Sequence, residues 1–410
     1  MKIFSNRNLH LTYCTNIHPG EDWSQVFANL VQYIPSLKKK LSPNQPFGIG
    51  LRLADSASRE LLQGNTLQEF KSWLYEHDLY VFTLNGFPYG GFHLQVVKDK
   101  VYAPDWAKQE RLDYTLRLTK ILAELLPENI EGSISTVPLS YKPWFEDNQS
   151  QAKVTSSATI HIAKVVAQMV QIRAETDKVL HLNLEPEPDA LLENADEVIE
   201  YFQKYLLPIG GAYLAKNLEI PQAAAEVLLL EHVRVCYDTC HFAVEYENPA
   251  SVFQRFAEAG IQIGKIQISA ALKAEIPQDK TQRLLLKERF QPFAESTYLH
   301  QVIARHPDGK LQHYQDLGAA LSFLEKTTAL EWRTHFHVPL FIDDYQVLQS
   351  TQDDIVKVFE LLQKNEICNH LEIETYTWEV LPPEMKVDIA ASIQREYEWV
   401  LWKLKAINSQ

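Results

Sequence analysis

The stretch VRVCYDTCHFAVEYENP, residues 233–249, decides the fold. It begins as an apolar, strand-like run that ends in Asp238, and His241 follows three residues later. The carboxyl ends of the strands of a (β/α)8 barrel are where such a protein carries its active site. An acid and an imidazole at this point therefore predict a barrel strand that leads into a functional site.

Seven other strand-like runs accompany this one, and helix-like runs separate them. The strand-like runs span residues 9–15, 47–53, 79–86, 130–139, 179–187, 263–269 and 370–378. The amphipathic, helix-like stretches include residues 24–34, 66–78, 111–126, 195–206 and 250–260. Strands that alternate with helices over short connections predict a parallel α/β fold, and eight strands predict a (β/α)8 (TIM) barrel. A doubly wound open sheet is the alternative, although no GxGxxG segment follows any of the runs.

No linker, repeat or low-complexity segment divides the 410 residues. We therefore predict a single TIM-barrel domain over residues 1–410, since barrels of this type often exceed the usual domain size. Residues 270–350, approximately, form a long predicted insertion between the seventh and eighth strands, with helical segments of its own. An amphipathic stretch at about 384–406 predicts a closing C-terminal helix.

Composition and charge limit the classes of function. The chain is 46% hydrophobic and 22% charged, with a formal net charge of −14. This acidic balance argues against nucleic acid as a partner, because it repels phosphate backbones. There is no signal-peptide core and no run of about 18 apolar residues, so neither secretion nor membrane insertion is expected. The four cysteines include no CxxC pair, which favours free thiols in a reducing compartment and hence a cytoplasmic protein.

Polar side chains gather where the strand-like runs end. The candidates are Asn16 and His18 after the first run, Asn85 and Tyr89 after the third, Glu185 and Glu187 at the fifth, Asp238 and His241 at the sixth, Gln267 in the seventh, Glu372 and Glu374 in the eighth, and an H-x-H pair, His335 and His337, in the insertion. In a barrel these ends meet on one face, so acids from three strands would converge. Converging carboxylates raise one another's pKa, and a divalent metal removes that repulsion. Asp, Glu and His together suit Zn, Mn or Fe as the cofactor.

Each of these motifs also has a purely structural interpretation. Asp238 or Thr239 could cap the following helix by accepting its free N–H groups. The LEPEP segment, residues 184–188, could be a surface loop that its prolines stiffen, and one imidazole of the H-x-H pair could be exposed on an edge strand. One of the two eighth-strand acids could pair with Arg52 of the second strand. The convergence of the motifs, rather than any one of them, supports the metal-site hypothesis.

Three of these segments resemble a known superfamily. YDTCHFAVEYE is similar to the D-T-C-H strand-end motif of endonuclease IV and of the xylose-isomerase-like sugar epimerases, LNLEPEP to their fifth-strand Glu segment, and LEIETYTW to their last strand. The core metal ligands that this resemblance implies are Glu185, Asp238, Gln267 and Glu374, with Gln267 at a place where the superfamily has histidine. The additional zinc ligands of endonuclease IV correspond to His241, His335 and His337, although aspartate is more usual at the place of His335.

Other features separate the chain from the nuclease. The third and fourth runs end in LNGFPYG and STVPLSY, without the histidines that endonuclease IV has there, and the acidic charge fits DNA poorly. The length, the opening LHLTYCTNIHPGEDW and the segment THFHVPLF resemble the EboE-type metabolite traffic proteins. That resemblance implies processing or export of a secondary metabolite, with a prenyltransferase-like membrane protein from the same gene cluster as a partner.

The sequence supports three hypotheses about function. In the first, a metal-dependent enzyme of the sugar isomerase or epimerase type uses Glu185 and Glu374 to exchange protons with a small polar metabolite, and Asp238 with His337 or His241 helps to hold the metal. The substrate-binding candidates are Asn16, His18, Asn85, Tyr89 and Glu187. In the second, a carrier on the same scaffold binds the metabolite without turning it over. In the third, an endonuclease IV-like phosphoesterase uses three metals.

Overall fold

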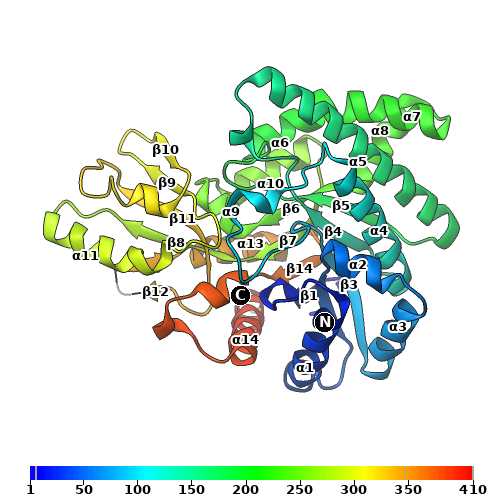
Figure 1. Cartoon of the computed structure of the whole chain (residues 1–410), viewed down its shortest axis with the longest axis horizontal. Coiled ribbons are helices and arrows are strands. Elements are labelled where there is room, and N and C mark those ends of the chain that lie inside the picture. Colours follow the sequence, from blue (N-terminus) through cyan, green and yellow to red (C-terminus); the bar gives the residue numbers. More distant parts are fainter. Residues whose placement is uncertain (5–6, 346, 409–410) are drawn as a thin grey trace.

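The computed structural model describes residues 1–4, 7–345 and 347–408 of the chain. At its centre the described residues form a sheet of eight parallel strands (Figure 1). These strands are β1 (His10–Tyr13), β2 (Phe47–Arg52), β3 (Leu79–Asn85), β4 (Gly132–Thr136), β5 (Leu180–Leu184), β6 (Val233–Asp238), β7 (Ile263–Ile268) and β14 (His370–Ile373). Their order is β1-β14-β7-β6-β5-β4-β3-β2, and neighbours pair in parallel.

The two ends of this sheet meet, so the sheet is closed. Cys14, directly after β1, forms a parallel bridge with Gly50 of β2. A closed ring of eight parallel strands with helical crossovers confirms the predicted (β/α)8 barrel and excludes the open, doubly wound sheet. Every residue of these strands is buried, because the ring has a filled interior on one side and helices on the other. This burial is the reason that most of the strands read as mainly apolar runs, whereas β4 (GSIST) is built largely of small polar residues.

Helices surround the ring (Figure 1). They are α1 (Trp23–Leu41), α2 (Asp55–Leu61), α3 (Thr66–Glu76), α4 (Gln109–Leu125), α5 (Asn148–Thr176), α6 (Ala195–Tyr201), α7 (Gly211–Leu218), α8 (Gln222–His232), α9 (Thr239–Val244), α10 (Pro249–Glu258), α13 (Gln352–Lys364) and α14 (Ile389–Asn408). The 3-10 helices are η1 (Thr15–Ile17), η2 (Lys98–Tyr102), η3 (Lys142–Trp144), η5 (Gln291–Phe293), η6 (Tyr376–Val380) and η7 (Pro383–Met385), and the π-helix η4 (Phe202–Gly210) continues α6. Over the described ranges, none of the helices is long and apolar enough to cross a membrane.

The long insertion between β7 and β14 is built on a second sheet. Its strands are β8 (Ala270–Glu275), β9 (Val302–Arg305), β10 (Leu311–Tyr314), β11 (Glu331–Val338), β12 (Asp344–Tyr345) and β13 (Leu348–Ser350), and its helices are α11 (Lys280–Phe290) and α12 (Leu317–Ala320). The strands pair antiparallel in the order β10-β9-β11-β8-β13-β12, beside the barrel (Figure 1). The insertion is therefore confirmed in its position, whereas the expected helical segments are joined by an antiparallel sheet that the sequence analysis did not predict.

The closing helix α14 begins at Ile389, five residues later than the sequence pattern indicated, because the short η7 helix and its prolines precede it. Its buried apolar residues are Ile393, Tyr397, Val400 and Leu404. This spacing places them on one face of the helix. The helix packs against α1 and α13, so the two ends of the chain lie on the same side of the barrel.

The barrel interior contains a buried ion pair. Lys265 Nζ on β7 lies 2.5 Å from Glu372 Oε2 on β14, and both side chains are fully buried. Arg52 lies elsewhere: its guanidinium donates to Gly20 O at 2.7 Å and pairs with Glu21 at 3.2 Å. The interior acid of the last strand is thus paired with Lys265, and the alternative pairing with Arg52 is wrong.

Candidate metal centre

Three carboxylates from three strands meet at the mouth of the barrel. Glu185 directly follows β5, Asp238 is the last residue of β6, and Glu374 directly follows β14. One oxygen of each lies within 4.8 Å of the others, and all three side chains are buried. Burial, together with the neighbouring carboxylate charges, raises the pKa of Glu185 and of Glu374 well above the ordinary range. Either protons or a cation must balance the negative charge of this cluster.

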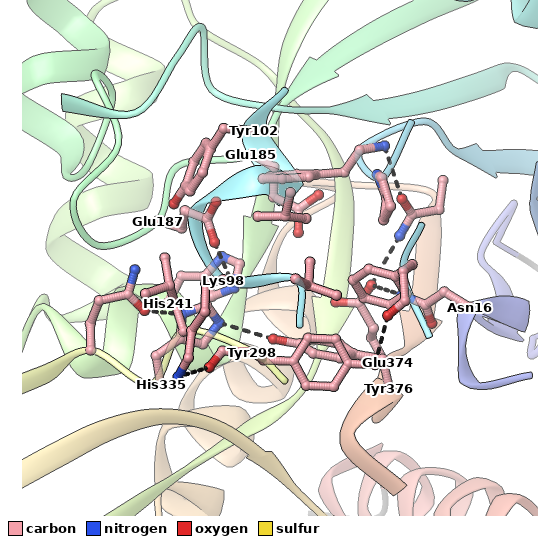
Figure 2. Close-up of a pocket in the computed structure, with 18 residues that line it drawn as sticks. Asn16, Lys98, Tyr102, Glu185, Glu187, His241, Tyr298, His335, Glu374 and Tyr376 are labelled. Carbon is pink, nitrogen blue, oxygen red and sulfur yellow. Dashed lines mark hydrogen bonds and ion pairs between the residues drawn. The ribbon is translucent and has the colours of Figure 1, made fainter. Parts of the chain in front are cut away.

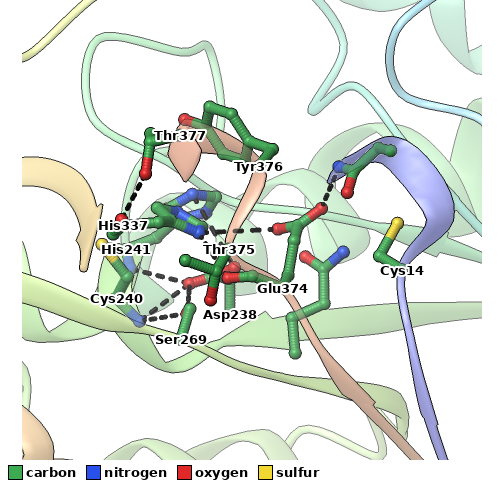
Figure 3. A network of polar contacts seen from close by, with 12 residues as sticks. Cys14, Asp238, Cys240, His241, Ser269, His337, Glu374, Thr375, Tyr376 and Thr377 are labelled. Carbon is green, nitrogen blue, oxygen red and sulfur yellow. Dashed lines mark hydrogen bonds and ion pairs between the residues drawn. The ribbon is translucent and has the colours of Figure 1, made fainter. Parts of the chain in front are cut away.

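The Asp238 carboxylate has one occupied oxygen and one free oxygen. Its Oδ1 accepts hydrogen bonds from Cys240 N (2.7 Å), His241 N (3.1 Å) and Ser269 Oγ (2.5 Å) (Figure 3). Asp238 therefore caps α9, as the structural interpretation of the sequence expected. Its Oδ2 is buried and has no hydrogen-bond partner among the described residues. Because an unpartnered buried acceptor is costly, the cap alone does not account for this side chain.

Three imidazoles beside the carboxylates each donate a hydrogen bond from Nδ1 to a carbonyl oxygen. These bonds run from His241 to Pro186 O (3.1 Å), from His335 to Gln301 Oε1 (2.9 Å) and from His337 to Glu374 O (3.0 Å). Since a carbonyl oxygen can only accept, each ring carries its proton on Nδ1 and presents the lone pair of Nε2. Burial lowers the pKa of all three imidazoles, so they are in the neutral form that binds metals.

The imidazoles and carboxylates form adjoining groups of donor atoms. Asp238, His241 and His337 place three donor atoms within 4.8 Å of one another, and so do Glu187, His241 and His335. His241 Nε2 lies 3.9 Å from Asp238 Oδ2 and 4.0 Å from Glu187 Oε2. Asp238 also belongs to the carboxylate group, so the groups share members and make one continuous cluster.

This cluster fits a divalent metal ion. Asp238 Oδ2, Glu185 Oε2 and His337 Nε2 are all buried without a hydrogen-bond partner in the part of the chain that the structure describes. Each of these atoms carries a lone pair of the kind that ligates a metal, and ligation would remove the cost of leaving it unpaired. Mixed carboxylate and imidazole donors suit divalent transition metals. The buried His, Glu and Asp side chains are therefore a candidate metal centre.

Three carboxamides adjoin the carboxylates. Asn16 Nδ2 and Asn85 Nδ2 both donate to Glu374 Oε1, at 2.8 and 2.9 Å, and so fix the orientation of that carboxylate. Gln267 lies in register with Asp238 on the neighbouring strand and is fully buried. Neither Oε1 nor Nε2 of Gln267 has a partner within the described ranges, so its carbonyl oxygen is free to act as a ligand.

The cluster opens into a cavity with about 540 Å³ of free space (Figure 2). The sequence candidates that line it are Asn16, Asn85, Glu185, Glu187, His241, His335 and Glu374. Asp238 and His337 adjoin these residues through the shared donor groups. Burial raises the pKa of Glu187 to about 8, so this carboxyl group, which lines the cavity, binds a proton near neutral pH.

The structure does not bring His18 and Tyr89 into this cavity. The chain turns through η1 after β1, and this turn stacks the His18 ring on Tyr33 with ring centroids 4.4 Å apart. His18 Nε2 lies 2.9 Å from Tyr13 Oη. Tyr89 packs edge-on against Tyr114, with ring centroids 5.2 Å apart. Both residues lie on segments that follow a strand, and their positions depend on the direction in which the segment leaves that strand. The pattern of residues within a strand does not predict this direction.

Several residues that line the cavity were missed in the sequence. They include Lys98, Tyr102, Tyr298, Gln301 and Tyr376. Tyr376 lies two residues after Glu374, so a search of strand ends could have found it. The others lie in η2 or in the insertion, where no barrel strand marks their position.

Comparison with known proteins finds solved structures with a similar fold. No protein-family model matches the chain, and no curated protein matches it in sequence. In structure it is similar to a xylose isomerase-like TIM barrel protein from Mycobacterium smegmatis in complex with magnesium, with 9% identity, a TM-score of 0.49 and coverage of 97% of each chain. It is also similar to the probable 3-DHS dehydratase AsbF from Bacillus anthracis (11% identity, TM-score 0.45, 96% of this chain and 98% of that chain). A third similar structure is the IOLI protein with a binding zinc atom (12% identity, TM-score 0.45, 97% and 99%).

The fold and the donor cluster together define a class of protein. It is a (β/α)8 barrel with a long insertion before its last strand and a buried cluster of His, Glu and Asp at the carboxyl ends of its strands. Sequence identities of 9–12% do not assign roles to individual residues. The roles of the site residues therefore depend on the geometry of this chain alone.

Proposed function

We propose that this protein is a metal-dependent enzyme of the isomerase or epimerase type that moves a proton on a small polyol-like or hydroxycarbonyl metabolite. One observation supports the proposal: a buried cluster of carboxylates and imidazoles has ligand atoms without partners among the described residues, and its members Glu185 and Glu374 line a cavity. A site that binds only protons would have no use for three neutral imidazoles, of which His241 has its Nε2 lone pair within 4.0 Å of the Asp238 and Glu187 carboxylates.

The residues that would hold the metal are the carboxylate cluster together with an imidazole. Glu185, Asp238 and Glu374 form the core set, His337 or His241 adds a nitrogen, and Gln267 can add its carbonyl oxygen. His335 would add a further nitrogen in the adjoining group that it forms with Glu187 and His241. Zn, Mn and Fe are the ions that this donor set suits. When bound, such an ion supplies Lewis acidity that polarises a carbonyl or hydroxyl oxygen of the substrate.

Glu185 and Glu374 are the groups that would transfer protons. Burial and the neighbouring acids raise the pKa of both carboxyl groups well above the ordinary range, which suits them to hold and release protons in general acid–base work. Glu185 would bind the metal through one oxygen of its carboxylate, and the other oxygen would accept a proton from the substrate carbon. Glu374 is oriented by Asn16 and Asn85, and it would return a proton to the substrate.

The metabolite in this proposal belongs to a pathway of secondary-metabolite processing or export, as the resemblance to the EboE-type metabolite traffic proteins implies. A prenyltransferase-like membrane protein from such a gene cluster is then the expected partner. Co-purification of the full chain with that membrane protein in detergent tests this part of the proposal. Failure to co-purify would remove the partner and leave the chemistry of the site unaffected.

Metal content tests the proposed centre. Protein purified without added metal and then incubated with Zn, Mn or Fe should retain metal after gel filtration, as measured by mass spectrometry of the elements. Asp238→Asn should lose most of this metal because Asp238 belongs to two donor groups, while asparagine still caps α9. Glu396→Gln is the matched control, because Glu396 is a buried carboxyl outside every donor group found in the described residues. Equal metal content in Asp238→Asn and the wild type contradicts the proposal.

Hydrogen exchange distinguishes an enzyme from a carrier. The metal-loaded protein in D2O should incorporate deuterium next to the carbonyl of a hydroxyketone substrate, and Glu185→Gln should abolish this incorporation. A carrier on the same scaffold would bind the compound and show no exchange in either protein.

The sharing of Asp238 and His241 between donor groups favours phosphoester hydrolysis as a second candidate function. Such a mechanism of the endonuclease IV type requires several metals held side by side. Retention of a single ion per chain at saturating metal excludes it. Cleavage of abasic-site DNA by the metal-loaded protein would favour it over proton transfer.

A further inference from the structure

The outer half of the cavity is formed by two segments that contact each other across the barrel mouth. One is the connection between β3 and α4, and the other is the part of the insertion just before β9. Val97 N and Lys98 N both donate to Thr297 O, at 2.7 and 2.9 Å, and Tyr298 Oη donates to Phe92 O at 3.1 Å. These bonds hold the two segments together where they line the cavity.

This outer half is apolar. The apolar residues that line it are Phe87, Pro88, Phe92, Val97, Val101 and Leu299. Phe92 packs against Tyr298 and Tyr376, with ring centroids 5.2 and 5.3 Å apart, so aromatic rings form part of this wall. Figure 2 shows Tyr298 and Tyr376 side by side in the cavity. A ligand made only of hydroxyl groups would leave this wall facing polar atoms that it cannot pair with.

The cavity has no cationic side chain free to bind an anion. Lys98 is the one lysine or arginine among the described residues that line it. Its three N–H donors are all used: Nζ donates to Tyr298 O (2.7 Å), Glu295 O (3.2 Å) and Asp316 Oδ2 (2.5 Å). The other ionisable side chains that line the cavity are acids, tyrosines and two histidines. The Nδ1–H groups of His241 and His335 already donate to Pro186 O and Gln301 Oε1, so neither ring has a free N–H for an anion. A phosphate group therefore has no side chain to bind it here.

We propose that the substrate is amphipathic and carries no phosphate. Its hydroxyl or carbonyl end lies at Glu185 and Glu374, and an aromatic ring or a short alkyl group lies against Phe87, Phe92 and Val101. Polar and apolar walls in one cavity match a ligand that has one polar and one apolar end. The proposal relies on the proposed function only for the placement of the polar end.

Three probes test this proposal by titration calorimetry on the metal-loaded full chain: glucose, phenyl β-D-glucoside and glucose 6-phosphate. The phenyl compound should bind at least about tenfold more tightly than glucose, because its ring is buried against the apolar wall. Glucose 6-phosphate should bind no more tightly than glucose. Equal affinity of the first two probes, no binding of the phenyl compound at millimolar concentration, or preference for the phosphate each overturns the proposal.

A pair of valine variants on the same connection locates the effect. Val101→Ser should reduce the preference for the phenyl compound roughly fivefold and leave glucose binding unchanged. Val96→Ser is the control, because Val96 is 58% exposed and does not line the cavity. An equal preference in the two variants, with unchanged melting temperatures, contradicts the assignment of the wall. Metal content and deuterium exchange on the same preparations report on the proposed function separately, so a protein that fails those tests and still prefers the phenyl compound retains the amphipathic site.

Discussion

Gly50 of β2 lies against the carboxylate of Glu372 on β14, so that any side chain at residue 50 would collide with Glu372 Oε1. Lys265 Nζ holds the same carboxylate at 2.5 Å, with both side chains fully buried. The charge of Lys265 also partly offsets the effect of burial and of neighbouring acids on the pKa of Glu185 and of Glu374. The Glu372 carboxylate therefore takes part in both features. It makes the close contact at Gly50, where the barrel closes, and it pairs with Lys265, whose charge acts on the acids of the site.

Replacing Gly50 by alanine is expected to destabilise the fold. The new Cβ would meet Glu372 Oε1 and would lie 2.8 Å from Tyr13 O, and the ion pair keeps the carboxylate from moving aside. Overpacking of this kind costs about 1–3 kcal/mol of the free energy of unfolding. In Gly318→Ala, the control, no heavy atom of the described residues lies within 4 Å of the added Cβ. Urea unfolding measures both variants, and equal midpoints would refute the close approach.

Removing Lys265 is expected to destabilise the protein more strongly. Lys265→Met would leave Glu372 buried without its partner, and such a loss costs about 3–5 kcal/mol. The double variant Lys265→Met/Glu372→Gln should recover a large part of that loss because no unpaired charge remains. Thermal and urea unfolding of the two single variants and the double variant measure the coupling. Additive losses would show that the two side chains do not stabilise each other.

A buried acid away from the donor groups predicts a dependence of stability on pH. Burial raises the pKa of Glu396 to about 7, although Thr375 Oγ1 donates to it at 2.6 Å. A carboxyl with a raised pKa in the folded state contributes stability that is present in full below about pH 4 and is lost as the pH rises to 7. Glu396→Gln removes this loss, so the variant should gain roughly 3 kcal/mol relative to the wild type between pH 4 and pH 8. Urea unfolding of the wild type and of the variant at several pH values measures this difference. If the free energy of unfolding of both proteins changed with pH in the same way, the raised pKa of Glu396 would be contradicted.

Gln301 is expected to act through His335. Its Oε1 accepts from His335 Nδ1 at 2.9 Å, and its Nε2 donates to Pro188 O at 3.1 Å, so it fixes the ring and its tautomer. Gln301→Leu should weaken zinc binding about 10–100-fold, as losing the hydrogen-bond partner of a ligand usually does. Competition with a chromophoric chelator measures the affinity. Gln349→Leu, an exposed residue of the same insertion, is the control, and equal affinity in the two variants would show that Gln301 does not position a ligand.

The barrel was predictable because its strands are buried on both faces. Each of the eight strand-like runs contains the observed strand, although the last run, 370–378, overestimates a strand that ends at Ile373. The antiparallel sheet of the insertion was not predictable in the same way. β12 and β13 have only two and three residues, and β10 exposes its first three residues, so these strands lack a continuous apolar run. Their pairing depends on contacts between distant segments, which no local pattern encodes.

The site was predictable where a side chain is attached to a barrel strand. Glu185, Asp238 and Glu374 lie at or next to strand ends, so the ring of strands alone brings them together. Lys265 was visible as a charge within an apolar run, but its partner follows only from the register of β7 and β14. The side chains of Tyr298 and of the rest of the apolar wall come from connections whose paths depend on tertiary packing.

The insertion limits which parts of this molecule could be exchanged with other barrels. β11 carries His335 and His337, and the segment before β9 contributes Tyr298 and Gln301. A shortened chain that joined β7 straight to α13 would keep its ring of strands and lose both imidazoles along with one side of the cavity. Grafting a brief loop from another barrel at this place would therefore create a scaffold with altered reactivity, and not a trimmed copy of the same protein.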